Sequence, residues 1–114
     1  LTGGAIAAQG ETVGKLQIVN SRFLNNKGVN GGAVGVIHTA VSIDNSEFIG
    51  NQSAATNSNE QTSGHGGAIY TDGASGKTNG EADGGLIEIR RSLIKNNQSE
   101  HEGGGGAAVY LSSG

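Results

Sequence analysis

The chain of 114 residues contains no cysteine, no proline and no methionine, and aromatic residues make up only 4% of it. Without cysteine, a disulfide framework and a thiolate metal site are both excluded. The 22 glycines cannot belong to a collagen helix, which needs proline and a glycine at every third position. No apolar run approaches the ~20 residues of a membrane-spanning helix. The net charge of −3, without blocks of like charge, makes nucleic acid and anionic membranes poor partners.

The absence of methionine, including an initiator, predicts a processed chain, an excised domain or the ordered part of something longer. No signal peptide is visible, and the length allows one domain. We therefore expect residues 1–114 to form a single segment of a longer chain.

A short glycine motif repeats along the chain. Its copies start at residues 3, 31, 66 and 105, so they are 28, 35 and 39 residues apart. The fourth copy, at residues 105–109, is looser. Constant motifs at unequal spacing indicate a fixed framework with loops of variable length. The three clear copies are Gly3-Gly4-Ala5-Ile6, Gly31-Gly32-Ala33-Val34 and Gly66-Gly67-Ala68-Ile69.

A second motif of eleven residues lies between the glycine motifs, at residues 16–26, 41–51 and 87–97. Its copies align without gaps and share aliphatic residues at positions one and three and Ser at position six. They also share a large apolar residue at position eight and Asn at position eleven. These last two positions are Phe23, Phe48 and Ile94, and Asn26, Asn51 and Asn97.

Alternation of apolar and polar residues opens each eleven-residue block and indicates a strand with one buried face. The Asn-Ser or Arg-Ser pair that follows predicts a turn, and the final Asn predicts a left-handed corner. Blocks of this kind would stack about 4.8 Å apart, with Phe23, Phe48 and Ile94 in one interior column and the final Asn residues in a bonded column. We therefore predict an all-β fold without significant helix: a right-handed parallel β-helix of about three coils plus a partial fourth.

Two polar stretches rich in Gly, Ser and Asn, at about residues 52–65 and 71–85, are expected to be surface loops rather than strands. Both end coils of such a stack would expose unpaired strand edges. The expected partners are therefore further coils of the same chain or neighbouring subunits.

These motifs resemble the GGA(I/L/V) and FxxN tetrapeptides of the polymorphic outer membrane proteins of chlamydiae, and the wider group of bacterial right-handed parallel β-helix repeat proteins. The FxxN motif matches at Phe23–Asn26 and Phe48–Asn51, whereas Ile94 replaces Phe in the third block. The resemblance implies an adhesive role for the repeat motifs, contact with a host or matrix surface, and an extracellular or outer-membrane-associated location. The resemblance also leaves open the interpretation that the chain is part of an autotransporter passenger domain.

Outward positions of the stacked blocks would bring Asp44, Glu88 and Arg90 to one face. Two carboxylates and a positively charged residue on such a face are the groups with which a polysaccharide lyase or hydrolase could act, with or without Ca²⁺. The simpler interpretation is a cross-strand charge pair, worth roughly 0.2–1 kcal/mol. We expect no catalytic role, but keep these three residues as the alternative site.

No metal centre is expected. The three histidines, His38, His65 and His101, would have to converge from different loops to bind zinc. The stretch between Asp72 and Asp83 offers oxygen ligands but lacks the spacing of known Ca²⁺ loops. No cofactor is therefore predicted, with Ca²⁺ as the open alternative.

The sequence thus favours a structural or adhesive module of a bacterial surface or secreted protein, and not an enzyme. The alternatives are a fragment of a β-helical polysaccharide lyase or hydrolase, and a spacer or peripheral subunit of a large extracellular assembly.

Overall fold

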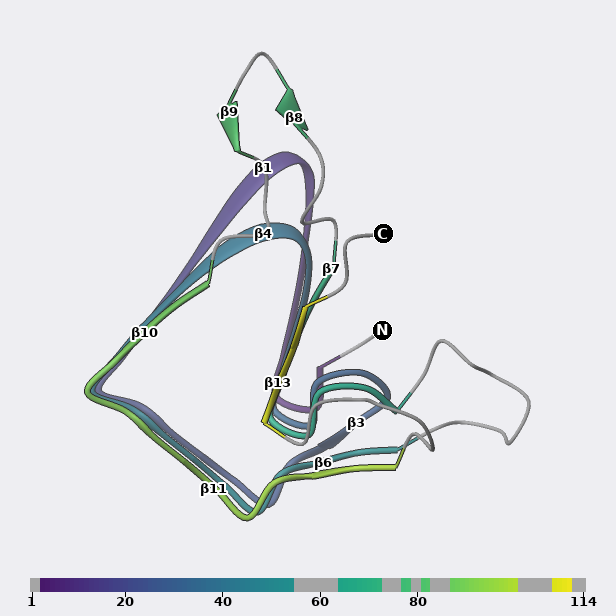
Figure 1. Cartoon of the computed structure of the whole chain (residues 1–114), viewed down its shortest axis with the longest axis vertical. Coiled ribbons are helices and arrows are strands. Elements are labelled where there is room, and N and C mark those ends of the chain that lie inside the picture. The colour runs from purple at the N-terminus through teal and green to yellow at the C-terminus, as the bar shows by residue number, and fades with distance from the viewer. Residues whose placement is uncertain are drawn as a thin grey trace.

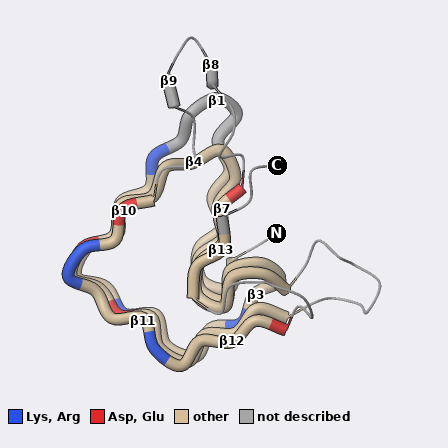
Figure 2. The backbone as a smooth tube through the Cα atoms, in the orientation of Figure 1, with Lys and Arg blue, Asp and Glu red and all other residues tan. Residues whose placement is uncertain are grey.

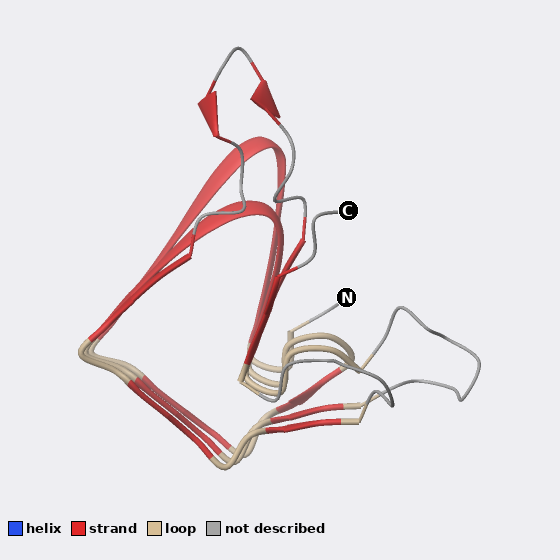
Figure 3. Cartoon of the chain, in the orientation of Figure 1, coloured by secondary structure: helices blue, strands red, loops and turns tan. Residues whose placement is uncertain are grey.

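The computed structural model describes residues 3–54, 64–72, 77–78, 81–82, 87–100 and 108–111. These residues form strands, turns and bends and no helix, and all but one of the strand pairs are parallel (Figure 3). The prediction of an all-β fold without helix is confirmed for this part of the chain.

Three parallel sheets contain eleven of the described strands. The first sheet has the order β1-β4-β7-β13, with β10 also paired to β4. It comprises β1 (Ile6–Val19), β4 (Val34–Asp44), β7 (Ile69–Asp72), β10 (Ile87–Arg90) and β13 (Val109–Leu111). The second sheet comprises β2 (Arg22–Leu24), β5 (Glu47–Ile49) and β11 (Leu93–Lys95), and the third comprises β3 (Lys27–Gly28), β6 (Gln52–Ser53) and β12 (Gln98–Ser99).

The chain visits the three sheets in the same order three times, and Figure 1 shows the successive turns lying over one another. We call these the first pass (residues 6–28), the second pass (34–53) and the third pass (69–99). Their register is the one that the gapless alignment predicts. In the first sheet Leu16 and Ile87 both pair with Val41, and in the second sheet Phe23 and Ile94 both pair with Phe48.

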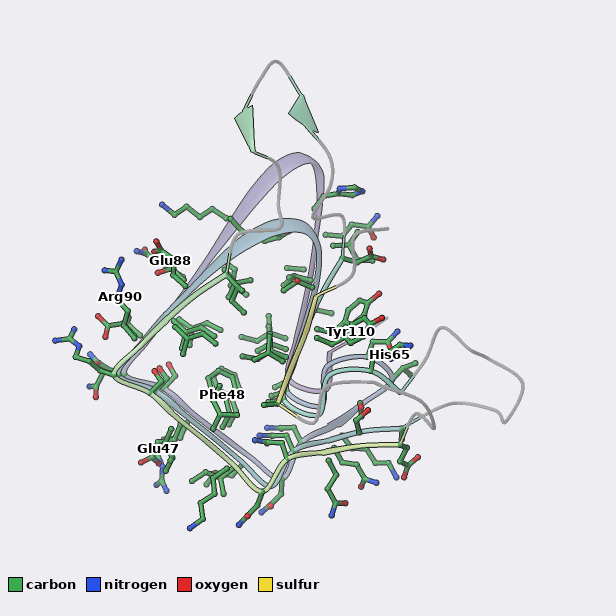
Figure 4. All side chains as sticks on the ribbon, in the orientation of Figure 1. Glu47, Phe48, His65, Glu88, Arg90 and Tyr110 are labelled. Carbon is green, nitrogen blue, oxygen red and sulfur yellow. The ribbon has the colours of Figure 1, made fainter. Side chains whose placement is uncertain are left out.

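The interior is filled by side chains from the inward positions of all three passes. Phe48 is fully buried, and its ring stacks on that of Phe23 with centroids 4.7 Å apart and planes inclined by 10°. Ile94 packs against the same cluster from the third pass. Figure 4 shows Phe48 pointing into the space between the first and second sheets. The eighth position of the block therefore fills the core.

The glycine motifs lie where one pass approaches the next too closely for a side chain. A Cβ on Gly32 would lie 2.1 Å from the Gly67 carbonyl oxygen, and one on Gly4 would lie 2.2 Å from that of Gly32. Gly31 and Gly66 also have positive φ angles of 74° and 66°. The framework thus requires Gly31 and Gly66 for their backbone conformation, and Gly4 and Gly32 for the close contact between passes.

The predicted loop boundaries need correction. Gln52–Ser53 is β6, and Thr71 and Asp72 complete β7, so both insertions begin later than the composition suggests. Within the second insertion, β8 (Lys77–Thr78) pairs with β9 (Glu81–Ala82) as antiparallel strands. The polar composition concealed these strands because their pairing is local and adds nothing to the apolar alternation of the passes.

Each pass is irregular at one bend within the first sheet, between the part of β4 that pairs with β7 and the part that pairs with β10. The first pass shifts register between Gln9 and Gly14, the second has His38 there with a positive φ of 50°, and the third places residues 73–86 between Asp72 and Ile87. β8 and β9 stand beyond this bend in Figure 1. The strands on both sides of the bend stay paired with β4, although the register of β1 with β4 shifts there.

Candidate functional site

The corner between the first and second sheets is built from positions five and six of the repeated block. Asn20, Asn45 and Arg91 occupy position five with φ angles of 51°, 48° and 48°. Asn adopts this left-handed conformation more readily than other residues with a side chain, because its short amide can bond locally. Arg91 departs from the repeat at this position and has a long charged side chain at the outer surface.

Serine at position six ties each pass to the next at this corner. The Oγ atoms of Ser21, Ser46 and Ser92 each donate a hydrogen bond to the carbonyl two residues earlier. The backbone N–H of Ser21 donates to Ser46 Oγ, and that of Ser46 to Ser92 Oγ, both at 3.1 Å. The shared serine is therefore part of the framework and links neighbouring passes at the corner by hydrogen bonds.

The final asparagines of the blocks form a bonded column between the second and third sheets. Asn51 Oδ1 accepts hydrogen bonds from the backbone N–H and Nδ2 of Asn26, each at 3.0 Å. Asn51 Nδ2 donates to the Phe23 carbonyl and to Asn97 Oδ1, both at 2.9 Å. The residue with positive φ is the one before, however: Asn25, Gly50 or Asn96. The prediction that the final Asn itself takes the left-handed conformation was wrong, since its side chain must point inward to form the column.

All three arginines of the chain lie at or beside this corner, and each pairs with one carboxylate. Arg22 Nε lies 2.8 Å from Glu47 Oε2, and Arg90 Nη2 lies 3.5 Å from Glu88 Oε2. Arg91 binds Asp44 through two hydrogen bonds, Nε to Oδ1 at 2.8 Å and Nη2 to Oδ2 at 2.5 Å. Figure 2 shows basic and acidic positions meeting between β10 and β11.

The alternative site predicted from the sequence is thus divided between two ion pairs. The register places Arg90 beside Asp44 and Glu88 beside Ser42, as the alignment predicts, but Asp44 bonds to Arg91 instead. Hydrogen bonds from Arg91 lower the pKa of Asp44 below its ordinary value; removal from water opposes the shift, and the charges of Arg91 and Arg90 add to it. A carboxylate held ionised in this way suits a hydrogen-bond acceptor better than a general acid.

An open groove of 680 Å³ lies across the three passes at this corner. It is lined by position five of the block, which is Asn20, Asn45 and Arg91, and by position seven, which is Arg22, Glu47 and Leu93. We call these two sets the walls of the groove. Ser21, Ser46 and Ser92 line it between these walls. Asn45 Nδ2 donates to Asn20 Oδ1 at 2.7 Å, which fixes two of the wall amides relative to each other. We call this surface the corner groove.

A smaller depression of 290 Å³ lies on the outer face of the first sheet, and Glu88 and Arg90 line it together with Lys15, Gln17, Ala40, Val41 and Ser42. The Glu88–Arg90 pair is exposed there, with 45% and 68% of the two side chains open to solvent. Figure 4 shows both side chains on the outside of the sheet. The alternative site therefore lies in a depression less than half the volume of the corner groove.

The histidines do not come together in the described part of the chain. His38 is exposed at the bend of the first sheet, whereas His65 is buried and its ring stacks on that of Tyr110 with centroids 4.4 Å apart. His101 and Asp83 lie outside the described residues. Among the described residues there is no group of three His, Asp or Glu side chains that could hold a metal ion. Asp72 instead accepts a hydrogen bond from the Tyr70 hydroxyl at 3.1 Å.

Residues 45–72 match the Chlamydia polymorphic membrane protein repeat. The match begins at the left-handed corner residue Asn45 and ends with β7, so it includes Phe48–Asn51 and Gly66–Ile69. No curated protein and no solved structure matches the chain. Within the described residues, no helix is long and apolar enough to cross a membrane. The chain is therefore similar to this repeat over the part that contains one copy of each motif.

Sequence reasoning missed the corner groove and the partner of Asp44. The signal was present in the gapless alignment, at positions five and seven of the block. Position five gives Asn20, Asn45 and Arg91, and position seven gives Arg22, Glu47 and Leu93. Their residue types vary from block to block, so the constant positions that define the repeat do not reveal them.

Proposed function

We propose that the chain is a segment of a right-handed parallel β-helix that serves as an adhesive module of a bacterial cell-surface or secreted protein. Three parallel sheets, visited three times in one order and one register, support the β-helical interpretation. The observation that carries the functional proposal is the match of residues 45–72 to the Chlamydia polymorphic membrane protein repeat. That likeness also supports an outer-membrane-associated location.

The packing of the repeat motifs supports a framework role for the motifs and an adhesive role for other residues. Ala33, Val34, Phe48, Asn51, Ala68 and Ile69 are all fully buried. Buried residues of a repeat framework stack on their neighbours and cannot contact a partner directly. Adhesion is therefore assigned to outward positions and insertions, which can vary without disturbing the stack, while the motifs themselves keep the surface rigid.

Other chain segments are the expected partners of the outer strand edges, and a host or matrix surface that of the outer faces. An enzymatic role for Asp44, Glu88 and Arg90 is less well supported, because each carboxylate is already bonded to an arginine. We propose no cofactor.

The adhesive proposal can be tested with beads coated with residues 1–114 and applied to cultured epithelial cells under flow. We expect them to adhere more strongly than beads coated with a Phe48→Asp variant, in which a charge at a fully buried position disrupts the fold. Equal adhesion of both coatings would contradict a role that depends on the folded surface. A crystal structure of the same segment would test the right-handed helical path, and a left-handed path or sheets that do not continue into one another would contradict it.

A further inference from the structure

The corner groove repeats with the passes, so it offers a similar set of groups at regular intervals. Each pass contributes one residue to each wall and one serine between them. Neighbouring passes pair as parallel strands on both sides of the corner, which places equivalent groups about 4.8 Å apart along the groove. A ligand that follows the groove therefore meets an approximate repeat of about 4.8 Å.

The charges along the groove alternate in sign from pass to pass. At position seven, the first pass contributes the guanidinium of Arg22 and the second the carboxylate of Glu47, whereas the third pass contributes the guanidinium of Arg91 from position five. Arg91 is bonded to Asp44, so the carboxylates that pair with these two arginines both belong to the second pass. The side chains of Arg22 and Arg91 are 66% and 76% exposed, so both retain N–H groups in solvent beside their ion pairs. The two cations lie two passes apart, about 10 Å along the stack, with the anion between them.

The groove walls suit hydroxyl groups and carboxylates. The amides of Asn20 and Asn45 can donate and accept hydrogen bonds, as vicinal hydroxyls do, and a guanidinium binds a carboxylate with strong charge-assisted bonds. An extended peptide advances about 3.3 Å per residue and alternates its faces about every 6.6 Å, and neither length matches the pass spacing. A chain of sugar rings, each ring contacting one pass, fits this surface better.

From the alternation of charge we propose that the corner groove binds a linear polysaccharide in which an acidic sugar alternates with a neutral one. The acidic sugars face Arg22 and Arg91, and the neutral sugar between them presents its hydroxyls to Glu47 and Asn45. A polymer with a carboxylate on every sugar would place one of them beside Glu47, where like charges repel. This inference rests on the proposed adhesive function and specifies the class of partner.

Three soluble polymers distinguish the possibilities when titrated into the complete 114-residue chain and followed by calorimetry. Hyaluronan oligosaccharides carry a carboxylate on every second sugar, polygalacturonate oligosaccharides carry one on every sugar, and dextran carries none. We expect hyaluronan to bind at least tenfold more tightly than either of the others, and added salt to weaken that binding because exposed charges are screened. Equal affinity for dextran, or no binding of hyaluronan, would overturn the proposal.

The repeat itself supplies substitutions that remove the cations with little risk to the fold. Arg91→Asn introduces the residue that stands at the same position in the first two passes, and Arg22→Leu introduces the residue of the third pass. Each should weaken hyaluronan binding about tenfold, as expected for the loss of one charged hydrogen-bond donor. Lys95→Ala is the matched control, since Lys95 is an exposed cation of β11 that does not line the groove. If Lys95→Ala weakens binding as much as the other two, attraction is non-specific and the proposal fails.

Glu47→Gln tests the alternation itself. It removes the negative charge between the two cations and should raise the affinity for polygalacturonate severalfold. The difference between the affinities for hyaluronan and for polygalacturonate should therefore become smaller. An unchanged ratio of the two affinities would contradict the assigned order of charges. If hyaluronan fails to bind while beads coated with the folded chain still adhere to cells, the groove assignment is wrong and the adhesive function stands.

Discussion

At the scale of single residues, the constant polar positions of the repeat form hydrogen-bonded columns. Ser46 accepts the backbone N–H of Ser21, and Asn51 accepts that of Asn26. Both side chains are buried, so the hydrogen bonds replace contacts that water would otherwise provide. These residues are constant because a substituted side chain would leave backbone groups of a neighbouring pass without partners.

Asn51 is the member of its column that a substitution should affect most. Asn51→Ala removes the side chain that bonds to Asn26, Asn97 and the Phe23 carbonyl, leaving buried polar groups unsatisfied. We expect it to lower the free energy of unfolding by about 3 kcal/mol or more, measured by urea denaturation. Asn26→Ala, at the less buried end of the described column, is the control and should cost less than half as much. Similar losses for both variants would contradict the column as the cause.

The Asp44–Arg91 pair predicts a pH dependence of stability. Because the pKa of Asp44 is lowered in the folded chain, its contribution is present above the ordinary value of 3.8 and is lost as the pH falls through the lower folded value. The difference in unfolding free energy between the native chain and Asp44→Asn should therefore shrink between pH 6 and pH 3. In an Arg91→Asn background the same difference should lose most of its pH dependence. A dependence that survives there would assign the shift to another cause.

At the scale of the strands, the second sheet depends on the column at position eight. Phe23 and Phe48 stack face to face, and Ile94 occupies the same place in the third pass. The apolar alternation fixes which residues point inward, and the gapless alignment fixes which of them are neighbours across strands. This part of the fold was predictable because each strand pair joins equivalent positions of the repeat.

Two substitutions at Phe48 separate volume from aromatic stacking. Phe48→Ala should lower the free energy of unfolding by about 3–5 kcal/mol, because it leaves a cavity at a fully buried position. Phe48→Ile introduces the residue that the third pass has at this position, and should cost less than half as much. Thermal and urea unfolding of both variants would measure this. Equal destabilisation would show that the ring stack, and not filled volume, is the main contribution.

At the scale of the whole molecule, the insertion of residues 73–86 is tolerated because it falls at a bend within the first sheet, between two strands that both pair with β4. The second pass joins Ile37 to Val41 through residues 38–40, and the third joins the partners of these residues, Asp72 and Ile87, through residues 73–86. The shorter connection shows that the framework does not need the longer one.

Replacing residues 73–86 with the sequence His-Thr-Ala of residues 38–40 should therefore leave the sheets intact. We expect an unchanged β-type circular dichroism spectrum and a change of a few degrees at most in the unfolding midpoint, since long surface loops cost little to close. Hydrogen exchange of Ile87 and Ile89 should keep the protection of the native chain. Loss of that protection would mean that the insertion itself holds β10 in place.

The sequence by itself determined the repeat, its register and the residues of the interior, because equivalent positions of parallel strands become spatial neighbours when passes stack. It also placed Arg90 beside Asp44 correctly, but not the partner of Asp44. That bond depends on the left-handed corner at Arg91, which directs a side chain from the turn back toward the preceding pass. The corner groove was likewise decided only by the tertiary structure. Its residues come from three separate turns, and the alternation of apolar and polar residues in the strands does not distinguish these from ordinary turns. The apolar periodicity identifies the buried residues, whereas the shape of the surface at a corner depends on backbone dihedral angles that the periodicity does not specify.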